Sequence, residues 1–107
     1  STYLLDVVTD DILEAVRIAS KLNKYLEIEF GMEIIKASAS NKATNYSKEI
    51  LSVSDVPVGT KIKFEAVELL ELLSTLEDDY TKFYFSSDLK EVYIENEHKK
   101  GKLEVIV

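Results

Sequence analysis

The stretch TDDILEAVRIASKLNKYLEIEF, residues 9–30, decides the class of fold. Its first part predicts a one-sided helix over Asp10–Asn23, because apolar side chains recur three and four residues apart (Ile12, Ala15, Val16, Ala19 and Leu22). We expect Thr9 or Asp10 to cap this helix, with acidic residues in its first turn. Its last part, Tyr25–Phe30, alternates apolar and acidic residues, which predicts a half-buried strand.

The same order of elements occurs twice along the chain. A second one-sided helix is expected over Glu65–Glu77, where leucines form a wider apolar stripe. The remaining strands are expected at Tyr3–Val8, Glu33–Ser40, Tyr46–Val53, Lys61–Phe64, Thr81–Ser86, Glu91–Asn96 and Lys102–Val107. The order β-α-β-β-β is therefore repeated, with an offset of 56 residues from Asp10 to Ala66 and from Tyr25 to Thr81.

We therefore expect one α+β domain over residues 1–107, with internal halves of about 1–57 and 58–107. Each helix has a single apolar face, so both should cover a sheet. The predicted architecture is a duplicated β-α-β-β-β unit with two helices packed on one side of antiparallel sheets.

Composition excludes several classes of function. The chain has 107 residues and no cysteine, which removes disulfides, thiolate nucleophiles and zinc-thiolate sites. The single histidine, His98, cannot serve both a catalytic triad and a metal site. The glycines are isolated from one another, so there is no glycine-rich phosphate-binding loop. We expect no enzyme, no cofactor and no metal. No apolar run reaches the roughly 18 residues of a membrane span, so we expect a cytoplasmic protein that makes no membrane contact.

The net charge of −7 disfavours a simple basic groove for nucleic acid, yet the first helix carries a basic stripe. On a helical wheel Arg17, Lys21 and Lys24 fall within about 60° of one another, opposite the apolar face. One interpretation is attraction to phosphates. The alternative is a solvated helix face on which Glu14 pairs with Arg17 or Lys21 at helical spacing.

Other polar and aromatic groups favour simpler interpretations. The second helix exposes Glu68 and Glu71, with no basic residue between Phe64 and Asp79. The basic residues around His98–Lys100 suggest a hairpin tip, and Glu77–Asp79 a solvated helix end and not a metal site. The aromatic run at Phe83–Phe85 predicts core packing, because Phe83 and Phe85 share one face of a strand and Tyr84 the other.

This element order resembles one domain of the DNA sliding clamps, a superfamily that includes PCNA and the bacterial beta clamp. Local sequence supports the resemblance over nearly the whole chain. Asp11–Leu22 is similar to the first clamp helix, and Leu26–Ala39 is similar to the paired strands that follow it. Lys61–Leu73 is similar to the second strand-helix unit. Val92–Asn96 and Leu103–Val107 are similar to the closing strands.

The resemblance implies a ring of six such domains, in which helices line the hole and face DNA. One domain is a sixth of that ring, so the chain is either part of a larger clamp or a homo-oligomer. It implies that Arg17, Lys21 and Lys24 face the backbone of duplex DNA. Clamps also join subunits by strand addition at sheet edges. The implied interface residues are Tyr46, Lys48, Ile50 and Leu51 of one edge and Leu103, Val105 and Val107 of the other.

The function implied is that of a DNA polymerase processivity factor, or one domain of it. It would encircle duplex DNA, bind DNA polymerase and a clamp loader, and associate with the nucleoid in a prokaryote. The acidic second helix keeps a second hypothesis open. In that hypothesis the chain is an acidic interaction or inhibitory module, which binds replication proteins without binding DNA.

Overall fold

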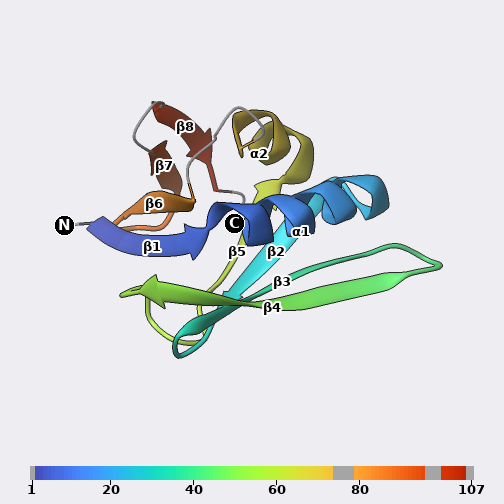
Figure 1. Ribbon diagram of the computed structural model, residues 1–107, viewed down its shortest axis with the longest axis horizontal. Helices are drawn as coiled ribbons and strands as arrows, with labels where there is room; N and C mark the ends of the chain where they lie inside the picture. Colours follow the sequence, from blue (N-terminus) through green and yellow to red (C-terminus); the bar gives the residue numbers. More distant parts are fainter. Residues whose placement is uncertain (1, 74–78, 96–99, 106–107) are drawn as a thin grey trace.

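The computed structural model describes residues 2–73, 79–95 and 100–105. In that part of the chain the elements follow the predicted order, β-α-β-β-β repeated once (Figure 1). Their bounds are Thr2–Val8 (β1), Thr9–Leu22 (α1), Tyr25–Phe30 (β2), Ile34–Ser40 (β3), Asn45–Ser54 (β4), Lys61–Glu65 (β5), Ala66–Leu73 (α2), Tyr80–Ser86 (β6), Glu91–Glu95 (β7) and Lys100–Glu104 (β8).

Most predicted bounds differ from these by one or two residues. Strand β8 begins at Lys100, two residues before the predicted start at Lys102. The offset between the halves also varies, since α1 and α2 begin 57 residues apart and β2 and β6 begin 55 apart. The predicted ends of the second helix, at Glu77, and of the last strand, at Val107, lie outside the described residues.

The eight strands among the described residues form one curled sheet in the order β5-β2-β3-β4-β1-β6-β7-β8, and all neighbours are antiparallel. The two halves of the repeat exchange their first strands, because β1 pairs with β6 and β5 pairs with β2. Strand β4 joins the two half-sheets: it pairs with β3 over residues 45–51 and with β1 over residues 52–54. The sheet bends at this strand (Figure 1).

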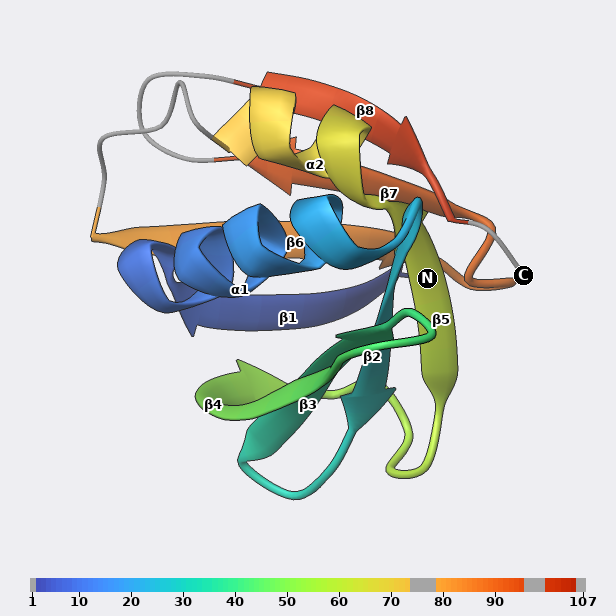
Figure 2. The ribbon, with the colours of Figure 1, turned by 90° about the vertical axis from the view of Figure 1, so that its right-hand side faces the viewer.

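Both helices lie on the inner side of the curled sheet and pack against each other (Figure 2), as predicted. Helix α1 buries Ile12, Ala15, Val16 and Ala19, and α2 buries Ala66, Leu69 and Leu73. At the centre of the core lie four phenylalanines, each at most 1% exposed: Phe30, Phe64, Phe83 and Phe85. The prediction that Phe83 and Phe85 share the inner face is confirmed.

The start of α1 differs from the prediction. Residue Val8 occupies the N-cap position and makes no side-chain capping hydrogen bond, so the expected cap at Thr9 or Asp10 is wrong. The hydroxyl of Thr9 instead lies 2.7 Å from that of Thr81 in β6, and both side chains are buried. The Thr9 amide donates to the Asp79 carbonyl oxygen at 2.8 Å. These two bonds attach the start of α1 to β6 and to Asp79, the residue that precedes it.

Candidate nucleic-acid interface

Arg17 and Lys21 lie on the exposed side of α1, opposite the residues that enter the core. They are four residues apart, so one turn of helix places them on the same stripe. Neither forms an ion pair with another residue in the described ranges. Their charges are therefore available to an external anion.

Glu14 belongs to the same exposed stripe but does not neutralise it. Its carboxylate Oε2 lies 3.2 Å from the Nζ of Lys48 in β4. The sequence alternative, in which Glu14 pairs with Arg17 or Lys21, is therefore wrong: the carboxylate reaches across to the sheet. An exposed pair of this kind adds at most about 1 kcal/mol to stability. Because of this ion pair, the Glu14 carboxylate is directed toward β4 and away from Arg17 and Lys21.

Lys24 lies beyond the helix and not on it, because α1 ends at Leu22. Its Nζ lies 5.6 Å from the centre of the Tyr25 ring, and its carbonyl oxygen accepts a hydrogen bond from the Ala66 amide at 2.9 Å. Lys24 therefore marks the place where the end of α1 meets the start of α2. Its side chain is exposed, and the helical wheel that grouped it with Arg17 and Lys21 does not apply beyond Leu22.

The second helix has the acidic surface that the sequence predicted. Glu68 and Glu71 are exposed, Val67 is 48% exposed, and the helix contains no basic residue. The helix pair therefore presents cations from the second half of α1 beside carboxylates from α2.

The outer face of the sheet carries charges that alternate in sign. Across β4, β3, β2 and β5 the successive register partners are Glu49, Lys36, Glu29 and Lys61. Opposite charges on neighbouring strands stabilise the sheet by a few tenths of a kcal/mol or more per pair and cancel one another's field. The balanced outer face contrasts with the basic stripe on α1.

Strand β4 has an open side along residues 45–51, where no described strand pairs with it opposite β3. Of the predicted interface residues on this strand, Ile50 is buried, and Tyr46, Lys48 and Ile50 all share the face toward α1. Leu51 points to the opposite face and is 74% exposed. The hydrogen-bonding edge is therefore exposed, while most of the side chains predicted there face inward.

Burial raises the pKa of Tyr46, and the charge of Glu14 raises it further, while the ammonium of Lys48 lowers it. The phenol oxygen of this tyrosine is buried and has no hydrogen-bond partner among the described residues. The ring of Tyr46 is partly buried and packs against the hydrophobic core.

The other predicted edge is β8, where Leu103 pairs with Val92 of β7. Val105 follows this strand, is 7% exposed and donates its amide hydrogen to the carbonyl oxygen of Lys90 at 2.9 Å. Val107 lies outside the described residues, as do His98, Glu77 and Asp78. Among the residues that are described, no group of acidic or histidine side chains is placed to hold a metal.

A curled antiparallel sheet built from a repeated β-α-β-β-β unit, with both helices on its inner side, is the fold of one domain of a DNA sliding clamp. Solved structures confirm this. A DNA polymerase sliding clamp from Caulobacter crescentus superposes with a TM-score of 0.84 at 16% identity, over 97% of this chain and 30% of the clamp chain. The DNA polymerase III subunit beta of Pseudomonas aeruginosa gives 0.84 at 13% identity, over 97% and 30%.

The DNA polymerase III beta chain of Streptococcus pneumoniae gives a TM-score of 0.80 at 13% identity, over 98% of this chain and 31% of that one. No family model and no curated protein sequence matches the chain. The chain spans about a third of the length of these clamps. No described helix is both long and apolar enough to cross a membrane.

Proposed function

We propose that this chain is a DNA sliding clamp, or one domain of a larger one. In this role it encircles duplex DNA, is placed there by a clamp loader, and tethers DNA polymerase without catalysing a reaction. The observation that carries the proposal is the pair Arg17 and Lys21: a sliding-clamp domain fold presents both cations, without ion pairs to other described residues, on the exposed side of α1.

The proposed contact with DNA is electrostatic. Arg17, Lys21 and Lys24 are long, flexible cations that attract phosphates without reading base sequence. Such contacts exchange easily between neighbouring phosphates, so they permit sliding. The carboxylates of Glu68 and Glu71 on α2 weaken the local field. We therefore assign the DNA-facing role to the α1 side of the helix pair.

The proposed assembly uses the two edges of the sheet. The open side of β4 along residues 45–51 offers unpaired backbone groups to the last strand of a neighbouring copy or domain. That strand would include Leu103 and Val105. Six domains joined in this way would close a ring, from copies of this chain or together with further domains.

Retention on DNA of different topology tests the proposal. The chain is first assembled in the presence of nicked circular DNA. Gel filtration at about 150 mM salt, close to physiological ionic strength, then separates DNA-bound protein from free protein and suppresses loose binding. The amount of bound protein is measured again after a restriction enzyme has linearised the circle. A clamp stays on the circle and is lost from the linear product. The double variant R17A/K21A should weaken retention. Its matched control, K61A/K63A, removes two cations from the outer face of β5 and should not.

A second candidate function rests on a different observation, the acidic exposed face of α2 and the net charge of −7. In this case the chain is a module that binds replication proteins and not DNA. This second candidate function predicts that the chain does not associate with duplex DNA even at about 20 mM salt, where contacts with phosphates are strong. It also predicts binding to polymerase or loader that E68K/E71K abolishes and R17A/K21A leaves unchanged.

A further inference from the structure

The outer face of the sheet carries an apolar patch at the end where the turn between β2 and β3 meets β4. Met32 is 80% exposed, Leu51 74% and Val53 71%, values above those of every other large apolar residue described. Ile34 is half-buried between them. We call Met32, Ile34, Leu51 and Val53 the β3–β4 patch.

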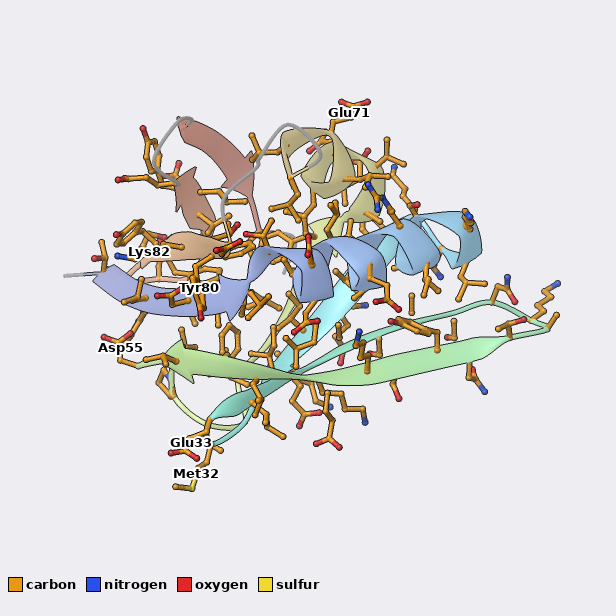
Figure 3. All side chains as sticks on the ribbon, in the orientation of Figure 1. Met32, Glu33, Asp55, Glu71, Tyr80 and Lys82 are labelled. Carbon is orange, nitrogen blue, oxygen red and sulfur yellow. The ribbon has the colours of Figure 1, made fainter. Side chains whose placement is uncertain are left out.

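Backbone pairing holds these four side chains together. Ile34 and Leu51 are register partners, and the Ser52 amide donates to the Glu33 carbonyl oxygen at 2.9 Å. The turn that carries Met32 therefore lies against the Ser52–Val53 end of β4. Figure 3 shows Met32 directed away from the molecule, on the side of the sheet opposite the helices. Leu51 and Val53 are two residues apart on one face, which separates them by about 7 Å.

Acidic residues flank the patch. Glu33 neighbours Met32, Glu49 precedes Leu51 on the same face of β4, and Asp6 of β1 is the register partner of Val53. Asp55 follows the end of β4 and is also exposed (Figure 3). Two lysines stand across from these acids: Lys36 opposite Glu49 and Lys82 opposite Asp6. The border of the patch is therefore net negative.

We propose that the β3–β4 patch binds a short segment of a partner protein that carries two large apolar side chains flanked by lysine or arginine. Exposed apolar clusters bordered by polar groups mark interaction surfaces, and the acidic border selects a basic partner. A second copy docked patch to patch would bring two sets of acids together. An anionic lipid surface would be repelled in the same way.

This site is independent of the proposed contact with DNA, because it lies on the opposite side of the sheet from α1. The two proposals can therefore fail separately. The double variant M32S/V53S, which leaves the proposed assembly edge at residues 45–51 unchanged, should leave DNA retention unchanged. R17A/K21A should leave peptide binding unchanged.

A display library of random 12-residue peptides, selected on the whole chain, tests the proposal. Peptides enriched on the wild-type chain should contain two large apolar residues between basic ones. Their affinity, measured by fluorescence anisotropy, should fall at least tenfold with M32S/V53S. The matched control V67S changes an exposed apolar residue on α2 and should bind like wild type. The double variant E33Q/E49Q should weaken binding about threefold at low salt, since charge complementarity contributes there.

Three results would overturn the proposal. The first is a selection that yields no peptide dependent on Met32 and Val53. The second is enrichment of apolar peptides without basic residues, which would remove the role of the acidic border. The third is concentration-dependent self-association that M32S/V53S abolishes, measured by sedimentation velocity, because the occupant would then be a second copy. Circular dichroism of each variant verifies that it is folded.

Discussion

Phe30 of β2 and Phe85 of β6 meet edge to face, with ring centroids 5.9 Å apart and planes at 86°. The two rings come from different halves of the repeated unit. Phe85 also lies 6.3 Å from Phe64 of β5 and 6.4 Å from Phe83. These contacts close one half-sheet onto the other, so the core depends on residues that no single half contains.

Replacing Phe85 with alanine should therefore destabilise the whole domain. A fully buried phenylalanine that becomes alanine loses its transfer free energy and leaves a cavity, at a cost of about 3–5 kcal/mol. Urea unfolding measures this as a lower midpoint. The control is Y80A, which truncates a ring that is 62% exposed at the start of the same strand and should cost less than about 1 kcal/mol. Equal losses in the two variants would contradict the closed core.

The buried hydroxyl pair of Thr9 and Thr81 makes a second prediction. The single variant T81V leaves the Thr9 hydroxyl buried without this partner, which should cost about 1–3 kcal/mol. The double variant T9V/T81V removes both hydroxyls and should recover much of that loss. A double-mutant cycle on unfolding free energies measures the coupling. Additive effects of the two substitutions would show that the hydroxyls do not depend on each other.

Local patterns predicted the elements because apolar spacing directly reflects which face is buried. The stripe of Ile12, Ala15 and Ala19 defined α1, and the alternation around Phe83 and Phe85 defined β6. The exchange of β1 and β5 between the halves was not predicted. It depends on pairing between strands far apart in the sequence, 32–40 positions for β2 with β5 and 72–84 positions for β1 with β6, which periodicity does not encode.

The candidate site was predicted in part. The exposed positions of Arg17 and Lys21 follow from the helical period. The bond between Glu14 and Lys48 joins residues 34 positions apart, so spacing along the helix suggested the wrong partners. The β3–β4 patch was missed because Met32 lies in a turn, where hydrophobic alternation gives no information about exposure.

Titration of Tyr46 should make stability depend on pH in the alkaline range. Burial raises the pKa of Tyr46 above its ordinary value of about 10, so the folded chain holds the phenol proton more tightly than the unfolded chain. This stabilisation is complete below pH of about 10 and is lost as pH rises through the folded pKa. Urea midpoints measured from pH 8 to 11 should show a smaller alkaline decline in Y46F than in wild type. An alkaline decline in Y46F as steep as in wild type would contradict the prediction.

A proline at Ser47 should block assembly without unfolding the chain. The Ser52 amide donates toward Glu33 beside β3, and N–H groups alternate in direction along a strand, so the Ser47 amide points to the open side of β4. Proline there removes an edge donor and no bond to β3. Light scattering across a concentration series should show a smaller mass for S47P than for S47A. Circular dichroism should show the same fold in both. An unchanged mass would exclude this edge from the assembly.

The salt dependence of DNA binding should reveal whether Arg17 and Lys21 contact phosphates. Each phosphate neutralised by a cation contributes about −0.9 to the slope of the logarithm of affinity against the logarithm of salt concentration. The variant R17A/K21A should therefore reduce the magnitude of the slope by about 1.8. The control K61A/K63A changes net charge equally on the outer face and should keep the wild-type slope. The slopes are measured by anisotropy titrations of a labelled DNA duplex of about 30 base pairs, at several salt concentrations. Equal reductions in both variants would mean that DNA responds to total charge and not to the α1 stripe.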